Sequence, residues 1–131
     1  MMNVDTLMEG GAVYNIKHRT YHFSKAVVLF VKDQKYPAVF SSLFDQLIRS
    51  TTSIGANLVE GIAGSSKNDF IKFYTISLKS ANETKYLLCL IRDTVIENKQ
   101  EEINKLINEA DELSKIIASI IVKTKDNKIK D

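Results

Sequence analysis

The sequence predicts an all-α fold, an antiparallel four-helix bundle with up-down-up-down order, and three observations support this prediction. Apolar residues recur at alternating spacings of three and four, the rhythm of near-parallel helix packing. The 131 residues include one proline and five glycines, so long stretches carry no helix breaker. No segment of useful length alternates apolar and polar residues as a strand would. The short links between helices favour the up-down-up-down order.

The first two helices are expected on either side of a single proline. The first covers about residues 15–34, and Pro37 ends it because the residue before a proline disfavours helical geometry. The second covers about residues 41–62, and either Ser41 or Ser42 can cap its start. The apolar stripes of the two helices consist of Ile16, Phe23, Val27, Phe30 and Val31, and of Leu43, Leu47, Ile54, Leu58 and Ile62.

The second helix has weak local preferences. The run of serines and threonines at 50–53, together with Gly55, has a lower helix propensity than alanine or leucine. This helix must therefore draw its stability from packing. Because glycine lets another backbone approach closely, Gly55 is predicted to lie at a tight helix crossing.

Two further helices are expected after a glycine-containing break at residues 61–65. Ser66 and Asp69 resemble a capping box in which aspartate replaces the usual glutamate or glutamine. The stripe of the third helix is Phe70, Tyr74, Ser77, Ala81, Thr84, Leu88, Ile91 and Val95, and that of the fourth is Ile103, Leu106, Ala110, Leu113, Ile117 and Ile120.

The chain has the length of one domain. We expect a flexible lead-in at residues 1–13, the bundle at 14–123 and a lysine-rich tail at 124–131. The residues predicted to be largely buried are Leu47, Ile54, Leu58, Phe70, Tyr74, Ala81, Leu88, Ile91, Leu113 and Ile117.

Charge is unevenly distributed, although the formal net charge is only +2. Residues 14–36 contain five basic residues and one acid, whereas residues 97–112 contain six acids and two lysines. Separated charge suits self-association or an anionic partner, and it does not choose between them. No apolar run is long enough for a membrane span, the N-terminus has no export pattern, and the single Cys89 forms no internal disulfide. A cytoplasmic protein is therefore expected.

No catalytic residue, metal or cofactor is expected. His18 and His22 lie four residues apart on one helical face, but zinc needs a third or fourth protein ligand that the neighbouring sequence does not supply. Cys89, between basic residues, fits a small core filler better than a reactive thiol. Glu60 and Glu83 have no histidine beside them, so a structural role suits them better than acid–base catalysis.

A polar stripe runs along the second helix, roughly opposite its apolar stripe. An ordinary solvated face consists mainly of Lys and Glu, whereas this one mixes amides, a guanidinium, a hydroxyl and a carboxylate, groups suited to specific hydrogen bonds. Two interpretations stay open: an ordinary polar surface, and a surface for a partner. The stripe consists of Gln46, Arg49, Ser53, Asn57 and Glu60.

These residues carry a family resemblance. The segments 46–49, 53–61 and 80–83, together with Phe70, resemble the signature of the bacterial four-helix-bundle family of proteins encoded in intervening sequences of 23S ribosomal RNA genes. The chain is also similar to the accessory variability proteins of diversity-generating retroelements. Gly55 stands where many members have proline. Lys79 stands where a glycine commonly precedes the serine.

The resemblance implies a non-enzymatic bundle that assembles as a ring, typically a homopentamer. In the retroelement branch it also implies a basic surface that binds nucleic acid and an association with a reverse transcriptase. The leading hypothesis is therefore an oligomeric RNA- or DNA-binding accessory protein. A structural or protein-binding oligomer without nucleic-acid affinity is the alternative, and a metal-dependent enzyme that uses His18 and His22 is a third. The proposed nucleic-acid contacts are Lys17, Arg19, Lys25, Arg49, Lys67 and Lys72, and the signature or interface residues are Gln46, Arg49, Ser53, Asn57, Glu60, Ser80 and Glu83.

Overall fold

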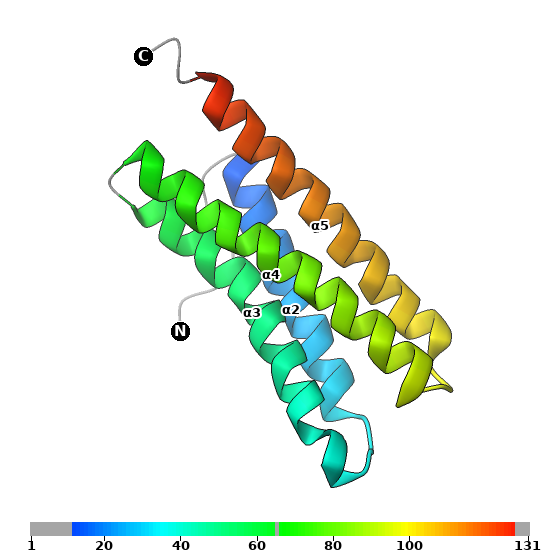
Figure 1. The fold of residues 1–131 in the computed structure, drawn as a ribbon. Helices are drawn as coiled ribbons and strands as arrows, with labels where there is room; N and C mark the ends of the chain where they lie inside the picture. Colours follow the sequence, from blue (N-terminus) through cyan, green and yellow to red (C-terminus); the bar gives the residue numbers. More distant parts are fainter. Residues whose placement is uncertain (1–11, 65, 128–131) are drawn as a thin grey trace, which may run out of the picture.

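The computed structural model describes residues 12–64 and 66–127, and within these ranges the regular structure is entirely helical. These ranges contain four long α-helices, and Figure 1 shows them side by side, each running opposite to the one before it in the chain. The all-α prediction is confirmed, and the arrangement is that of an up-down-up-down bundle. The elements are α2 (Ala12–Lys32), the 3-10 turn η1 (Ala38–Phe40), α3 (Ser41–Ala63), α4 (Lys67–Thr94) and α5 (Gln100–Asp126).

The helix ends differ from the expected ones by a few residues. Helix α2 begins three residues before the predicted start and ends at Lys32, two residues before the predicted end. Helix α5 continues to Asp126, so the first residues of the predicted tail are helical. Most of the predicted lead-in, residues 1–11, and the last four residues of the tail lie outside the described residues.

The local interactions at the helix ends differ from one link to the next. After α2, the Gln34 side-chain amide donates to the carbonyl oxygen of Phe30 at 3.0 Å, and Pro37 then precedes η1. Neither Ser41 nor Ser42 caps α3, because η1 runs directly into the helix and places Phe40 at the capping position. The expected cap of α4 is confirmed: the Ser66 hydroxyl accepts the backbone N–H of Asp69 at 3.1 Å.

The core lies along the axis between the four helices. Nine of the ten residues predicted to be buried are buried. Phe70 is only partly buried, and its ring stacks on Tyr74 with ring centroids 4.0 Å apart. In α3 the buried face is rotated relative to the prediction, so that Phe44 is buried while Leu43 is only partly buried and Ile62 is exposed.

The packing between α3 and α4 is the most extensive, and that between α2 and α5 is much smaller. At the crossing of α2 and α3, a Cβ atom added to Gly55 would lie 3.0 Å from Thr20 Oγ1. The predicted close approach at Gly55 is therefore confirmed, and the partner is the middle of α2.

Candidate functional site

Part of the polar stripe lies in the interface between α3 and α4. The Asn57 side-chain amide donates to the Ser53 carbonyl oxygen at 2.8 Å and to the Ser53 hydroxyl at 2.9 Å. The Ser53 hydroxyl in turn lies 2.8 Å from the Ser80 hydroxyl of α4. Three of the signature residues thus form one hydrogen-bonded chain that links the two helices, a structural role that needs no external partner.

Small polar side chains extend this hydrogen-bonded contact between α3 and α4, the α3–α4 seam, in both directions along the helices. Ser77 Oγ donates to the Ile54 carbonyl oxygen at 2.7 Å. Thr84 Oγ1 lies 2.9 Å from Ser50 Oγ and also donates to the Ser80 carbonyl oxygen at 2.8 Å. Because these side chains are short, the two helices approach closely while each of these serine and threonine hydroxyls keeps a hydrogen-bond partner. This explains why a helix with weak local propensity is stable here.

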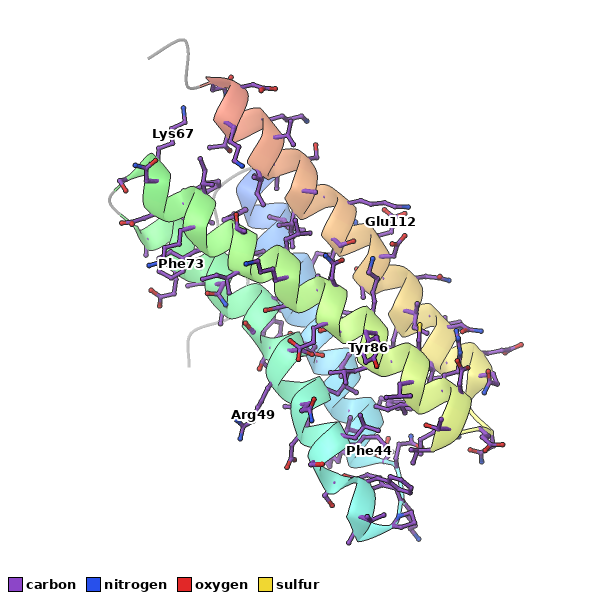
Figure 2. All side chains as sticks on the ribbon, in the orientation of Figure 1. Phe44, Arg49, Lys67, Phe73, Tyr86 and Glu112 are labelled. Atoms are coloured by element: carbon purple, nitrogen blue, oxygen red, sulfur yellow. The ribbon has the colours of Figure 1, made fainter. Side chains whose placement is uncertain are left out.

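The other signature residues stay at the surface. Gln46, Arg49, Glu60 and Glu83 are all exposed. Figure 2 shows the Arg49 side chain projecting from α3 into solvent. Within residues 16–64 and 66–127, neither the Arg49 nor the Glu60 side chain takes part in a hydrogen bond or ion pair. These groups are available for a partner, and the two do not pair with each other.

Of the six proposed nucleic-acid contacts, one is buried and another is held in an internal ion pair. Lys17 is only 7% exposed, which does not suit a surface contact to phosphate. Arg19 forms a two-pronged ion pair with Glu109 of α5, with both N–O distances at 2.7 Å. This hydrogen bonding, and secondarily the charge of Glu109, outweighs partial burial and raises the pKa of the Arg19 guanidinium. The sequence offered no signal for this pair, because its members are 90 residues apart.

The remaining proposed contacts are at least partly accessible. Lys25, Arg49 and Lys72 are exposed, whereas Lys67 at the start of α4 is partly buried. Figure 2 shows Lys67 at the end of α4 that lies beside the turn from α3. The Lys72 ammonium lies 5.5 Å from the centre of the Phe73 ring, a distance that fits a weak cation–π contact.

The acidic segment of α5 is also partly neutralised inside the molecule. Besides Glu109, Asp111 is engaged: its two carboxylate oxygens lie 3.1 Å from Lys85 Nζ and 3.0 Å from Lys115 Nζ. Hydrogen bonds from Lys115 and then Lys85 lower the pKa of Asp111. The charge separation seen in the sequence is therefore smaller on the molecular surface than the residue count implies.

An apolar groove that sequence analysis missed lies between α2 and α3. It encloses about 290 Å³. Gly55 and the exposed side chains of Tyr21 and Val59 form part of its lining. The sequence signal for this groove was the pair of neighbouring small residues, Gly55 and Ala56, followed one turn later by Val59. The lining residues are Tyr21, Ser24, Thr52, Gly55, Ala56 and Val59.

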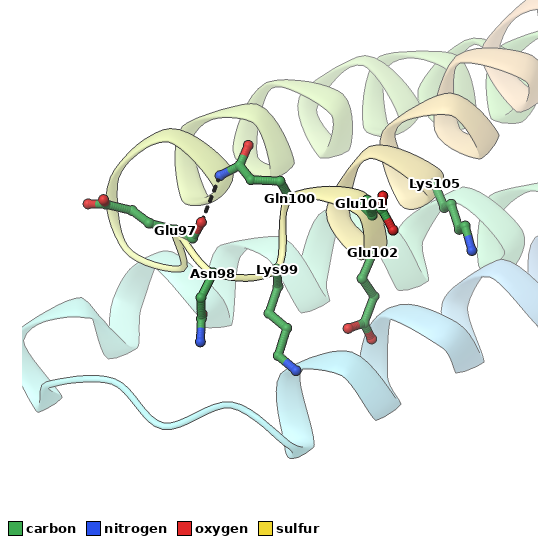
Figure 3. A pocket seen from close by; sticks show the side chains of 7 residues that line it. All are labelled: Glu97, Asn98, Lys99, Gln100, Glu101, Glu102 and Lys105. Atoms are coloured by element: carbon green, nitrogen blue, oxygen red, sulfur yellow. Dashed lines mark hydrogen bonds between the residues drawn. The ribbon is translucent and has the colours of Figure 1, made fainter.

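A second pocket, of about 500 Å³, lies at the turn between α4 and α5. Figure 3 shows its charged side chains of both signs and the hydrogen bond that the Gln100 amide donates to the Glu97 carbonyl oxygen, 3.2 Å long. Its lining contains neither histidine nor cysteine, so it offers no nucleophile–base pair. We regard it as the surface of a well-ordered turn.

The groups considered for catalysis do not assemble into one site. The Nε2 atoms of His18 and His22 lie 3.0 Å apart on α2. Cys89 is partly buried on α4, and Glu60 and Glu83 are exposed. In the described part of the chain, no group of three or more His, Cys, Asp or Glu side chains is placed to hold a metal ion. No helix in that part is both long and apolar enough to cross a membrane.

The comparisons with known proteins agree with the fold and the signature. A crystal structure from Bacteroides thetaiotaomicron, described as a protein with unknown function from the S23 ribosomal protein family, is 34% identical to this chain. The match covers 81% of this chain and 97% of that one, with a TM-score of 0.71. No protein with a curated description matches. The profile of the 23S rRNA-intervening sequence proteins matches residues 14–119, and the chain therefore belongs to this family.

Proposed function

We propose that this protein is a cytoplasmic, ring-forming oligomer that binds nucleic acid as an accessory protein and has no catalytic activity of its own. The observation that carries the proposal is a set of exposed cations, Lys25, Arg49 and Lys72, contributed by three different helices. Arg49 in particular has no internal ion-pair partner among the described side chains. An exposed guanidinium of this kind suits a phosphate or a carboxylate of another molecule.

Self-association is supported by the groove between α2 and α3. Its lining is mostly apolar, and Tyr21 and Val59 beside it are exposed to solvent. A contiguous apolar surface on a small protein is typical of an interaction site. Arg49 and Glu60 on the same helix would then provide polar contacts that orient the neighbouring copy. The preference for five copies comes from the family resemblance alone.

Nucleic-acid binding would follow from repetition of modest contacts. One subunit offers few exposed cations, so its contribution to affinity is small. A ring repeats each cation around its axis, and tethered contacts add through effective concentration. Binding of this kind depends on phosphates and releases counterions, so it should be strongly salt-dependent and only weakly sequence-dependent.

The mass of the native protein tests the assembly. Light scattering coupled to size exclusion should give several times the 14.8 kDa of the chain, with five the favoured multiple. The variant Ala56→Glu, which places a carboxylate in the groove, should lower the mass, whereas Asn68→Glu, at an exposed position of α4, should not. A wild-type protein that is monomeric at micromolar concentration would defeat the ring proposal.

Charge reversal tests the binding. The double variant Lys25→Glu/Lys72→Glu should bind mixed-sequence RNA and DNA more weakly than wild type, in fluorescence anisotropy at about 50 mM salt. The matched control is Lys99→Glu/Lys105→Glu, which changes net charge equally at two exposed lysines near the acidic turn. Equal losses in both variants would indicate a nonspecific field effect.

The alternative is a structural or protein-binding oligomer. The burial of Lys17 and the ion pair of Arg19 with Glu109 favour it, because both reduce the basic surface. If the oligomer binds neither RNA nor DNA at low salt, this alternative replaces the leading proposal. A reverse transcriptase as the protein partner is implied only by the retroelement resemblance.

A further inference from the structure

We propose that His18 and His22 form a two-histidine chelate for a divalent transition-metal ion that prefers square-planar or tetragonal coordination, Cu²⁺ or Ni²⁺. The two residues lie one turn apart on α2, and a hydrogen bond of 3.0 Å joins their Nε2 atoms. His22 is exposed and His18 is partly exposed, so an ion reaches both from solvent. This site is independent of the proposed nucleic-acid binding and of the ring.

The two nitrogens lie close enough to share one ion. Two nitrogens bound to the same ion at about 2.0–2.1 Å are roughly 2.8–3.0 Å apart at a right angle and about 3.3–3.4 Å apart at a tetrahedral angle. The 3.0 Å separation here is the length of a hydrogen bond in which one imidazole donates its N–H to the other. A bound ion would take the place of that shared proton. The distance alone does not choose the metal, and the number of protein ligands does.

The orientation of the rings also suits a shared ligand. The ring centroids are 4.3 Å apart, only slightly farther than the two nitrogens, and the ring planes are inclined by 67°. The rings therefore lie side by side and do not meet end to end, and their two Nε2 atoms are in hydrogen-bond contact. The Tyr21 ring meets His22 edge-on, with centroids 5.4 Å apart, and limits the rotation of that imidazole.

The number of protein ligands argues against zinc, as the sequence analysis also concluded. A structural zinc ion needs four protein ligands, and no third His, Cys, Asp or Glu side chain joins this pair among residues 16–64 and 66–127. Copper and nickel bind imidazole strongly and accept water in their remaining positions, with copper favoured in the general affinity order. Two protein nitrogens therefore suffice for binding and leave the other positions open to exogenous ligands.

Binding should stabilise the folded state. The short distance between the two nitrogens exists only while this turn of α2 is helical, so an ion held by both binds the folded protein in preference to the unfolded one. Such a ligand raises the apparent stability in proportion to ln(1 + [L]/Kd). Metal should thus raise the thermal midpoint in a way that depends on both histidines.

The test uses Cu²⁺ alone in a non-coordinating buffer at neutral pH, with the full chain carrying Cys89→Ser to remove the thiol. Calorimetric titration should give one high-affinity ion per chain. Electron paramagnetic resonance should report two equatorial imidazole nitrogens. His18→Ala and His22→Ala should each weaken binding by on the order of tenfold or more, because the second imidazole is then no longer held at a high effective concentration.

The matched control is His22→Ala/Ala26→His, which keeps two histidines on α2, the new one at an exposed position, but separates them by about 12 Å along the helix axis. It should bind like the single variants and show no metal-dependent rise in the thermal midpoint. Circular dichroism confirms that the variants remain helical. The proposal is overturned if this control binds as tightly as the parent protein, or if resonance reports a single nitrogen.

Discussion

At the scale of single residues, the burial of Tyr74 has two opposite effects on stability. Its ring is fully buried, and its hydroxyl has no hydrogen-bond partner among the described residues. Burial raises the pKa of this phenol to about 12, because the charged form is poorly solvated in the core. The ring stabilises the bundle while the hydroxyl opposes that stabilisation.

We expect Tyr74→Phe to leave the free energy of unfolding unchanged or to raise it by about 1 kcal/mol at neutral pH, because it removes a buried unpaired hydroxyl. Between about pH 10 and 12 the unfolded phenol loses its proton while the folded one keeps it. The wild type should therefore lose stability relative to the variant as the pH rises through this range. Urea unfolding at several pH values measures the difference, and a marked loss at neutral pH would show that the hydroxyl has a partner.

Leu58 and Leu88 test the core itself. Both side chains are fully buried, so replacing either by alanine removes apolar contacts and leaves a cavity. We expect each substitution to lower the free energy of unfolding by about 2–5 kcal/mol, as measured by denaturant titration. Val122→Ala on the exposed face of α5 is the control and should change the free energy by less than about 0.5 kcal/mol. Equal effects at all three positions would contradict this assignment of the core.

Individual residues also show which features the sequence could predict and which it could not. Periodicity located the buried faces because each turn of helix repeats the same geometry, and so it found Leu58 and Leu88. It could not place Arg19 against Glu109, since that contact depends on which faces of the first and last helices meet. It also treated Lys17 as a surface cation, although the side chain is buried. Charge counted along the chain therefore overestimated the basic surface.

At the scale of helices, the crossing of α2 and α3 depends on Gly55. Alanine normally stabilises a helix interior by about 1 kcal/mol relative to glycine. Here the added Cβ would lie 3.0 Å from Thr20 Oγ1, whose hydroxyl already donates to the Lys17 carbonyl oxygen at 2.8 Å. The close approach is thus a specific feature of this pair of residues.

We expect Gly55→Ala to fail to stabilise the wild-type protein but to stabilise a Thr20→Ala background. Removing the threonine hydroxyl makes room for the new methyl group, so the two substitutions should not be additive. Thermal unfolding of the wild type, both single variants and the double variant completes the cycle. Additive effects would show that Gly55 and Thr20 do not limit the approach of the helices.

The polar stripe of α3, one pattern in the sequence, has two different environments in the structure. Sequence analysis identified the polar stripe and left open whether it was solvated or a partner surface. The structure divides it: Ser53 and Asn57 join Ser80 in internal hydrogen bonds, whereas Arg49 and Glu60 remain exposed. The division depends on which residues of α3 lie opposite Ser80 of α4, which periodicity along one helix does not reveal.

At the scale of the whole molecule, assembly should be visible in stability. If the folded subunits associate, the unfolding midpoint must depend on protein concentration, because mass action favours the oligomer. We expect the thermal midpoint of the wild type to rise when its concentration is raised from about 1 to 100 μM, and that of Ala56→Glu to change less. A midpoint independent of concentration in both proteins would argue for an isolated bundle.

The ion pair between Arg19 and Glu109 has a kinetic consequence. Most helix packing here joins elements that follow one another along the chain, so those contacts form with little loop-closure entropy. The contact of α2 with α5 instead spans 90 residues and must close the largest loop. We expect this closure to come late in folding, so Glu109→Gln should mainly accelerate unfolding in stopped-flow measurements and leave the folding rate nearly unchanged. The first and last helices would then separate first when the bundle opens, and Arg19 would become available to an outside anion while the seam between α3 and α4 stays intact.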